Sequence, residues 1–327
     1  MKATSAPIST TGAAAAGQQP IIAFSVISDV HLRAGVSDRG VPYRDRRAER
    51  KFASALQDLH RIAPSQDLLV IDGDLTVTGM PSDYEDMNEI MKQYPHPRAL
   101  YAMGNHEFYA AYHNKSGRRS PRTFPNGITE EKCISRFLTY TQMPSLYYDE
   151  WLKGYHFIVL GSESSIITNP RRGDGAYLSE AQLTWLGQKL LDSPPDKPVF
   201  VFLHEPLPFT VSGTTAHDVL NPVQLTRVLA LHHQVILFTG HTHRTLKGQS
   251  KSVYRNGYTL FNDASVRNPL DVRKRPTGDS EGLYVKVYKD QVVVMGRDFT
   301  HHVYIRQMTL PVASTPHPLN ISGLRSP

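Results

Sequence analysis

Two histidines two residues apart, His241 and His243, follow the apolar run QVILF in the stretch FTGHTHRT. Imidazole nitrogens at the tip of a strand can hydrogen-bond the neighbouring loops, or they can bind a metal ion. A lone histidine in such a place most often has the structural role. The residues that follow the other predicted strands therefore decide which chemistry applies.

Short apolar runs that predict buried strands recur along the chain, over 22–28, 68–71, 98–103, 156–161, 199–203 and 235–238. In open α/β sheets, ligands bind at the carboxyl ends of such strands. Polar residues follow five of these runs: Asp29-Val30-His31, Asp72-Gly73-Asp74, Gly104-Asn105-His106-Glu107, His204-Glu205-Pro206 and Thr239-Gly240-His241-Thr242-His243. Turn chemistry favours Gly, Pro, Asn and Asp rather than His, so the repeated histidines indicate a common ligand.

This set of residues offers carboxylates, one amide oxygen and several imidazoles. The only cysteine is Cys133, so a metal site must use nitrogen and oxygen ligands and no intrachain disulfide can form. The mix suits Mn, Fe, Zn, Ni or Co better than Ca or Mg. There are too many ligands for one ion, so we expect two divalent metal ions that share a bridging carboxylate. Gly73, Gly104 and Gly240 are expected to let the backbone turn sharply beside the ions.

Helical patterns separate the predicted strands. The sequence predicts helices over 47–62, about 82–93, 179–190 and 221–231. Ser82-x-x-Glu85 and Ser179-x-x-Gln182 have the form of capping boxes, and Asn221-Pro222 is typical of an N-cap followed by proline at the first helical position. The residues from 108 to about 127 predict a long loop, and the alternating pattern after residue 254 predicts antiparallel strands that complete a second sheet.

The 327 residues suffice for one large α/β domain, which we expect over 21–310. Residues 1–20, rich in Ala, Ser, Thr and Gly, predict a disordered leader, and 311–327 a C-terminal tail. No run approaches the ~18 apolar residues of a membrane-spanning helix. The single cysteine suits a cytoplasmic location, although an exported protein without disulfides would look the same.

The formal charge is +6, and basic clusters lie at 44–51, 115–119 and 272–275. Such clusters are either solvated surface or a positive field that attracts anionic substrates such as phosphate esters. The loop over 108–127 directly follows the Gly-Asn-His-Glu motif and carries Lys115, Arg118, Arg119 and Arg122. It is either a border of the substrate cleft or a plain surface loop.

The motifs D-x-H, G-D, G-N-H-E, a lone H and G-H-x-H, in this order and each after a strand, resemble the calcineurin-like metallophosphoesterase superfamily. They span Asp29 to His243, about two thirds of the chain. The resemblance implies an α/β fold, a four-layer α/β/β/α sandwich of two mixed sheets flanked by helices. It also implies a dinuclear metal centre at one edge of the sandwich.

By position in these motifs, the resemblance implies two sets of ligands. Asp29, His31 and His243 would hold the first metal ion, whereas the second would be held by Asn105, His204 and His241. Asp74 would bridge the two ions, and His106 matches the catalytic histidine that approaches the phosphate. We expect His241 and His243 to serve different ions from one extended strand tip, because residues i and i+2 point the same way in extended chain.

Other polar residues near the motifs are not expected to bind metal. Asp72 is interpreted as a structural neighbour, and Glu107 and Glu205 are expected to hydrogen-bond the loops. Val77 stands where purple acid phosphatases carry the metal-binding tyrosine of G-D-x-x-Y, so a tyrosinate–iron(III) centre is not expected. His60 and His156 are expected to be surface or core residues, as are His232 and His233.

The expected activity is metal-dependent hydrolysis of a small phosphoester. The stretch GDLTVTGMPSDYEDM resembles the second-motif region of class III cyclic-nucleotide phosphodiesterases, which favours a phosphodiesterase. A broad phosphomonoesterase and a nuclease are the alternatives. Nucleic acid is the less favoured partner, because no coiled-coil arm or DNA-capping domain is evident. A non-catalytic scaffold on the same fold would be expected to lose ligands that are all present here. The sequence does not specify an oligomeric state.

Overall fold

The computed structural model describes residues 18–312, so the expected leader and tail lie almost entirely outside the described residues. The chain builds two six-stranded mixed sheets. The first has the order β14-β13-β12-β1-β4-β5 and the second β10-β11-β9-β8-β7-β6. The first sheet contains β1 (Ile22–Ile27), β4 (Leu68–Asp72), β5 (Ala99–Ala102), β12 (Glu281–Val287), β13 (Gln291–Asp298) and β14 (Val303–Pro311). The second contains β6 (Tyr148–Leu152), β7 (Tyr155–Val159), β8 (Val199–Phe202), β9 (Val235–Thr239), β10 (Val253–Arg255) and β11 (Thr259–Asn262).

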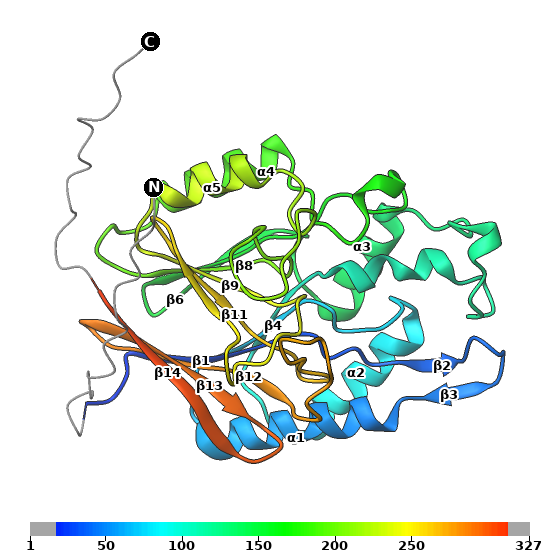
Figure 1. The fold of residues 1–327 in the computed structure, drawn as a ribbon, viewed down its shortest axis with the longest axis horizontal. Helices are drawn as coiled ribbons and strands as arrows, with labels where there is room; N and C mark the ends of the chain where they lie inside the picture. Colours follow the sequence, from blue (N-terminus) through cyan, green and yellow to red (C-terminus); the bar gives the residue numbers. More distant parts are fainter. Residues whose placement is uncertain (1–17, 313–327) are drawn as a thin grey trace, which may run out of the picture.

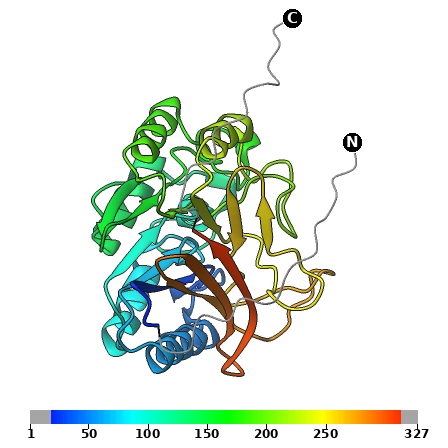
Figure 2. The same ribbon diagram turned by 90° about the vertical axis from the view of Figure 1, so that its left-hand side faces the viewer.

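Helices cover the outer face of each sheet, which confirms the expected mixed α/β sandwich (Figures 1 and 2). On the first sheet these are α1 (Arg46–Ile62), α2 (Pro81–Gln93) and α3 (Glu130–Thr141). On the second they are α4 (Glu180–Leu191) and α5 (Pro222–Ala230). Between the sheets, Phe24 packs edge-on against Phe157 and Phe200, with ring centroids 5.2 and 4.8 Å apart. The central strands β1 and β8 are apolar except for Ser25, whose buried hydroxyl donates to Gln66, because both of their faces are buried.

Four helices lie where the sequence predicts them, whereas α3 was not predicted, and two of the predicted caps differ. The capping box at Ser82 is wrong: α2 begins one residue earlier at Pro81, and Ser82 Oγ donates to Ala34 O instead. Ser179 does cap α4 by accepting from the Gln182 N–H. Asn221 precedes α5 as expected, but its side chain bonds the backbone of Leu178 rather than capping the helix.

The strands near the C-terminus differ from the prediction in the sheet that they join. They do not all complete the second sheet: β12, β13 and β14 extend the first sheet, with β12 antiparallel to β1. Only β10 and β11 belong to the second sheet, and β11 is parallel to β9. Periodicity predicts a strand but carries no information about its distant partner, which explains the error.

The long loop predicted after residue 108 is also only partly correct. The 3₁₀ helix η1 covers Asn105–Tyr112, and η2 covers Pro121–Thr123. A hairpin of β2 (Ala34–Val36) and β3 (Pro42–Arg44) lies beside the intervening residues, with Asp38 Oδ1 3.9 Å from His113 Nε2. A third 3₁₀ helix, η3, covers Pro170–Arg172. Within residues 18–312, no helix combines the length and the apolar character needed to cross a membrane.

A buried ion pair ties α1 to the first sheet. Arg297 on β13 donates from Nε and from a terminal nitrogen to the two oxygens of Asp58, at 2.7 and 3.0 Å. Arg61 and His302 contact the same carboxylate. Burial alone would raise the pKa of Asp58, but the hydrogen bonds from Arg297 and Arg61 hold it below its usual value.

We expect Asp58→Asn to lower the free energy of unfolding by about 3 kcal/mol at pH 7, because Arg297 would keep a buried, unpaired charge. A carboxyl whose pKa falls on folding stabilises the protein above its unfolded pKa, and this contribution is lost as the pH falls. The difference between the two proteins should therefore shrink below about pH 4. Urea unfolding of both proteins at pH 7 and below about pH 4 measures this difference in the free energy of unfolding. Arg61→Ala is the control and should cost less than ~1 kcal/mol, because Arg61 is 58% exposed.

Candidate metal centre

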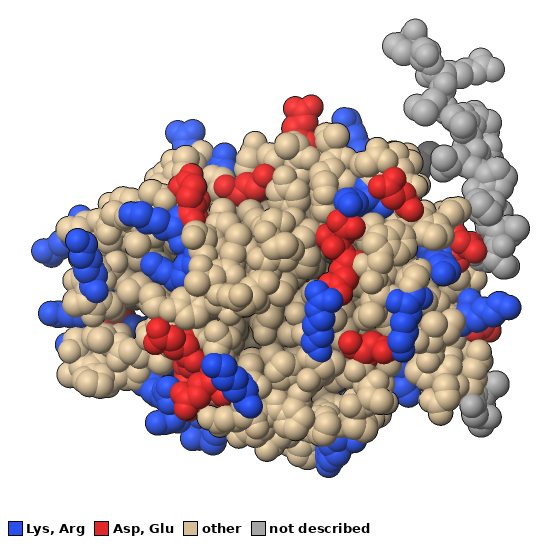
Figure 3. Space-filling model, turned by 180° about the vertical axis from the view of Figure 1, so that it is seen from behind, with Lys and Arg blue, Asp and Glu red and all other residues tan. Residues whose placement is uncertain are grey.

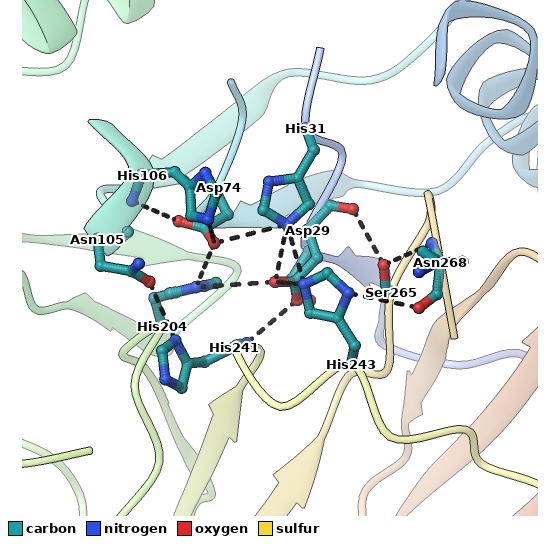
Figure 4. A network of polar contacts seen from close by, with 12 residues as sticks. Asp29, His31, Asp74, Asn105, His106, His204, His241, His243, Ser265 and Asn268 are labelled. Carbon is teal, nitrogen blue, oxygen red and sulfur yellow. Dashed lines mark hydrogen bonds and ion pairs between the residues drawn. The ribbon is translucent and has the colours of Figure 1, made fainter. Parts of the chain in front are cut away.

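Five strands deliver their carboxyl ends to one edge of the sandwich. In the first sheet β1, β4 and β5 are parallel, and in the second β8 and β9 are parallel. Backbone hydrogen bonds join the loops that follow them, including Asp29 N to Gly73 O and Gly240 N to His204 O. All eight side chains singled out in the sequence therefore meet in one cluster, where they point toward one another (Figure 4).

One half of the cluster is a tight set of four side chains. Asp29, His31, Asp74 and His243 each offer a ligand atom, and these atoms lie within 4.8 Å of one another. His243 Nε2 lies 2.9 Å from both Asp29 Oδ1 and His31 Nε2. Three of these four, Asp29, His31 and His243, are the residues expected to hold the first metal ion. The fourth, Asp74, is the residue expected to bridge the two ions.

The other half contains Asn105, His204 and His241. Asn105 Oδ1 lies 3.0 Å from His241 Nδ1, and the rings of His204 and His241 are 5.5 Å apart. Asp74 lies between the two halves, with Oδ2 3.2 Å from His204 Nε2 and 3.6 Å from His31 Nε2. His204 Nε2 also lies 3.8 Å from Asp29 Oδ1, so the two halves are in contact, and the division of the seven side chains between two metal ions stays a prediction.

Backbone carbonyls orient three of the imidazoles. The ring Nδ1 atoms of His204, His106 and His243 lie 2.7, 2.9 and 3.4 Å from Asp72 O, Val77 O and Asn268 O, respectively. A proton held on Nδ1 leaves Nε2 free to face the centre. The partner of His204 is the backbone carbonyl of Asp72, whereas the Asp72 carboxylate itself has no hydrogen-bond partner among the described residues. His106 Nε2 lies 4.0 Å from Asp74 Oδ2, at the margin of the cluster.

The two central carboxylates are fully buried among histidines. Burial would raise the pKa of Asp29, yet His243 and His204 hold it well below its usual value. Asp74 behaves in the same way because of His204 and His106. Burial would lower the pKa of His204, but Asp74 and Asp29 raise it well above its usual value. Burial and the charge of His106 lower the pKa of His31 to about 4.

Unpartnered atoms in the cluster test whether a cation fits. Asp29 Oδ2 accepts from Ser28 Oγ and from the His241 N–H, at 2.7 and 3.1 Å. Asp29 Oδ1 and His204 Nε2 are buried and make no well-aligned hydrogen bond among residues 18–312, although His243 Nε2 and Asp74 Oδ2 lie 2.9 and 3.2 Å from them. Both atoms face the centre, and a carboxylate oxygen beside an imidazole nitrogen that gives up its proton suits a divalent transition metal. The donor set therefore fits a metal ion.

The family assignment rests on the whole motif region. A sequence profile of the calcineurin-like phosphoesterase family matches residues 22–245. The chain belongs to the calcineurin-like phosphoesterase family. Its expected class, a metal-dependent phosphoester hydrolase, is confirmed at the level of the family.

Relatives of this phosphoesterase include two curated bacterial proteins. A 3′,5′-cyclic-nucleotide phosphodiesterase of Nostoc is 24% identical over 239 residues, which cover 72% of this chain and 77% of the relative. A 3′,5′-cyclic adenosine monophosphate phosphodiesterase of Escherichia coli K12 is 28% identical over 192 residues, 58% of this chain and 59% of the relative. Among solved structures, a purple acid phosphatase from yellow lupin seeds aligns with a TM-score of 0.59 at 13% identity, covering 90% of this chain and 54% of that one. That last likeness concerns the fold alone.

The backbone of the phosphoesterase centre is not extended where the sequence analysis expected it to be. His241 and His243 have φ of 65° and 54°, in the left-handed region, as do Asp29, His31 and Asp74. The expectation that His241 and His243 share an extended strand tip is therefore wrong. Such conformations cost of order 1 kcal/mol or more per non-glycine residue, and they cluster at functional sites. Their side chains diverge because the chain turns at each one.

Glycines permit the close approach of these loops. Gly73 has φ of 83°, which favours glycine. The other two need glycine for space rather than for φ. A Cβ on Gly240 would lie 2.6 Å from Ser28 Oγ and 2.8 Å from Asp29 Oδ2, and one on Gly104 would overlap Asp74. The expectation of a sharp turn thus holds for Gly73, whereas Gly104 and Gly240 admit a carboxylate of another loop.

The two glutamates beside the ligands behave differently. Glu107 is fully buried and accepts from the backbone N–H groups of Asp74, Thr76 and Gly104, at 3.1, 3.1 and 2.8 Å. It therefore hydrogen-bonds the loops, as expected. Glu205 does not, because neither of its buried oxygens has a partner among the described residues. Burial raises the pKa of Glu205 to about 8, which favours its neutral form.

Several supporting residues of this phosphoesterase were not identified from the sequence. Asp218 Oδ1 lies 3.8 Å from His241 Nε2. Ser265 Oγ donates to Asp29 O, and Asn268 lies beside His243 (Figure 4). Tyr109 contacts both Asn105 and His106. Apart from Tyr109, which follows the Gly-Asn-His-Glu motif directly, they come from segments without a motif, and no local pattern marks any of them.

We expect Gly104→Ala to reduce the metal content of both proposed sites, because the added methyl group would displace the Asp74 carboxylate that they share. Metal content after dialysis against Mn²⁺ or Zn²⁺ measures the effect, and circular dichroism checks the fold. Gly187→Ala is the matched control, since an added Cβ there meets nothing nearer than 4.0 Å and a helix favours alanine. Full metal content in the Gly104 variant would contradict the assigned role of this contact.

Proposed function

We propose that the protein is a phosphodiesterase whose seven converging side chains hold two divalent cations, Mn, Fe, Zn, Ni or Co. Asp29, His31 and His243 hold one cation and Asn105, His204 and His241 the other, with Asp74 between them. The observation that supports this proposal is the position of the Asp74 carboxylate, with Oδ2 3.6 Å from His31 Nε2 and 3.2 Å from His204 Nε2 within one cluster. When bound, such a pair of cations activates water and neutralises charge on the phosphate.

The chain's own groups position the substrate and handle the proton of the leaving group. His106 is the side chain of the cluster that is best placed for this task, because its ring is one quarter exposed while Asp74 is almost fully buried. Val77 O holds its Nδ1, so Nε2 faces the centre. A protonated Nε2 can donate to the departing oxygen or to a phosphate oxygen in the transition state.

The surroundings of the centre favour an anionic substrate. The residues around 115–119 follow η1 directly, and they meet the β2–β3 hairpin, where a Cβ on Gly40 would lie 3.0 Å from Arg118 Nε. Arg39, Lys115, Arg118 and Arg119 are exposed. Lys and Arg side chains gather along the left-hand edge in Figure 3, which is the side of β2 and β3 in Figure 1. This field attracts phosphoesters to the neighbouring centre.

A diester is favoured over a monoester by the two curated relatives, whose names describe cyclic-nucleotide phosphodiesterases. Cyclic nucleotides are thus the first substrates to be tested. A monoesterase remains the second candidate because the same pair of cations can hold either phosphate. We place the enzyme in the cytoplasm, in keeping with its single buried cysteine.

Activity with defined metals tests this function. Protein stripped by a chelator should be inactive, and it should recover with about two equivalents of Mn²⁺, Zn²⁺, Co²⁺, Ni²⁺ or Fe²⁺ per chain. A panel of bis-p-nitrophenyl phosphate, p-nitrophenyl phosphate, cyclic nucleotides and single-stranded DNA then ranks diesters against monoesters. Activity confined to DNA and steeply lost with rising salt would identify a nuclease instead. Failure to bind any metal would favour a scaffold.

We expect His106→Ala to retain both cations but to lose ~10²- to 10⁴-fold in kcat on an alkyl diester. On bis-p-nitrophenyl phosphate the loss should be smaller, because p-nitrophenolate leaves without a proton. Steady-state kinetics on both substrates, with metal content measured on the same samples, separates the effects. His60→Ala, at an exposed position on α1, is the matched control. Normal turnover of the alkyl diester would show that His106 has no catalytic role.

A further inference from the structure

Asn105 differs from the other six proposed ligands because its side chain has two unlike ends. The Oδ1 end can bind a cation, whereas the Nδ2 end carries two hydrogens and cannot. A rotation of the amide by half a turn would replace one end by the other with little change in shape. Something in the protein must therefore fix the amide with its oxygen toward the centre.

The contacts of Asn105 show which groups meet each end. Nδ2 donates to the hydroxyl oxygen of Tyr109 at 3.2 Å, and Oδ1 lies on the side of the centre, 3.0 Å from His241 Nδ1. Asn105 is only 7% exposed, so water has little access to correct a wrong orientation. The Tyr109 ring also lies against His106, with centroids 4.2 Å apart.

The polarity of the Tyr109 hydroxyl is set in turn by Asp174. The hydroxyl donates its single hydrogen to Asp174 Oδ1 at 2.6 Å. A carboxylate can only accept, so the Tyr109 oxygen is left as an acceptor on its other side. An inverted Asn105 amide would place Oδ1 against this oxygen with no hydrogen between them, which is repulsive. Asp174 therefore selects the orientation of Asn105 through Tyr109.

We propose that Tyr109 is a positioning residue that holds the Asn105 amide with Oδ1 toward the second cation, and that Asp174 fixes the polarity of this contact. The proposal rests on the proposed function, since it assumes that Asn105 is a ligand. Groups that orient metal ligands in this way typically change metal affinity by about 10- to 100-fold. Tyr109 is not itself proposed as a ligand, so it would act on the cation only through Asn105.

Tyr109→Phe removes the hydroxyl and keeps the ring against His106. Calorimetric titration of the metal-free protein with Mn²⁺ should show one equivalent unchanged and the other weakened by about 10- to 100-fold. Tyr112→Phe is the matched control, because Tyr112 packs on Tyr109 with centroids 5.6 Å apart but does not contact Asn105. It should leave both affinities unchanged.

A double-mutant cycle with Asn105→Asp separates orientation from packing. Aspartate presents an oxygen at either end, and the Tyr109 hydroxyl can turn its single hydrogen from Asp174 to the oxygen that faces it, so neither orientation of the carboxylate removes an oxygen from the centre. In the Asn105→Asp background, Tyr109→Phe should change the second affinity by less than about threefold. An equal loss in both backgrounds would show that Tyr109 acts by packing alone and would overturn the proposal.

The titration of the unsubstituted protein distinguishes this proposal from the function on which it rests. If that protein binds fewer than two equivalents of Mn²⁺, the proposed dinuclear centre fails and the role of Tyr109 fails with it. If it binds two equivalents and Tyr109→Phe binds them equally well, only the role of Tyr109 is refuted.

Discussion

Two buried carboxylates that have no fixed counter-ion determine how the rest of this structure is built. Asp29 and Asp74 are at most 2% exposed, and within residues 18–312 all of their ion-pair partners are histidines. A buried charge must be compensated, and imidazoles compensate it only while they hold protons. Metal ions compensate it without protons, so binding of metal and release of protons from His204 and His243 are linked.

Holding these charges together requires a backbone that local sequence preferences oppose. Five of the proposed ligands have left-handed φ values, and such strain persists only when surrounding contacts over-determine it. The contacts come in layers: paired backbone hydrogen bonds join His31 to Asp74 and Leu32 to Leu75, and Glu107 binds three N–H groups of two loops. The paired parallel strands fix the distance between the loops, because each loop begins at the end of a strand that is hydrogen-bonded to its neighbour.

The chemistry was more predictable from the sequence than the support around it. Short motifs mark the proposed ligands because a cation needs particular atoms, and the strands before them are marked by apolar runs. Pairing between distant strands leaves no local mark, so β12 to β14 were expected in the wrong sheet. Asp174 was missed for the same reason, because the Tyr109 hydroxyl that donates to it lies 65 residues away in the sequence. Ser82 also illustrates the limit, because the carbonyl of Ala34 competes for its hydroxyl.

A second cluster shows why residue types alone do not make a metal site. Asp279, Asp298 and His301 also offer ligand atoms within 4.8 Å of one another. There, however, Lys247 Nζ contacts Asp279 and Asp298 at 2.9 and 2.6 Å, so a permanent cation already occupies the space between the carboxylates. Lys247 thus stabilises the two carboxylates without any metal ion. Burial alone would raise the pKa of Asp298, but the hydrogen bonds from Lys247 and His301 hold it below its usual value. At Asp29 and Asp74 the equivalent space is surrounded by imidazoles, which can yield it to a metal ion. The difference between a structural cluster and a metal centre is thus the presence or absence of one fixed ammonium group.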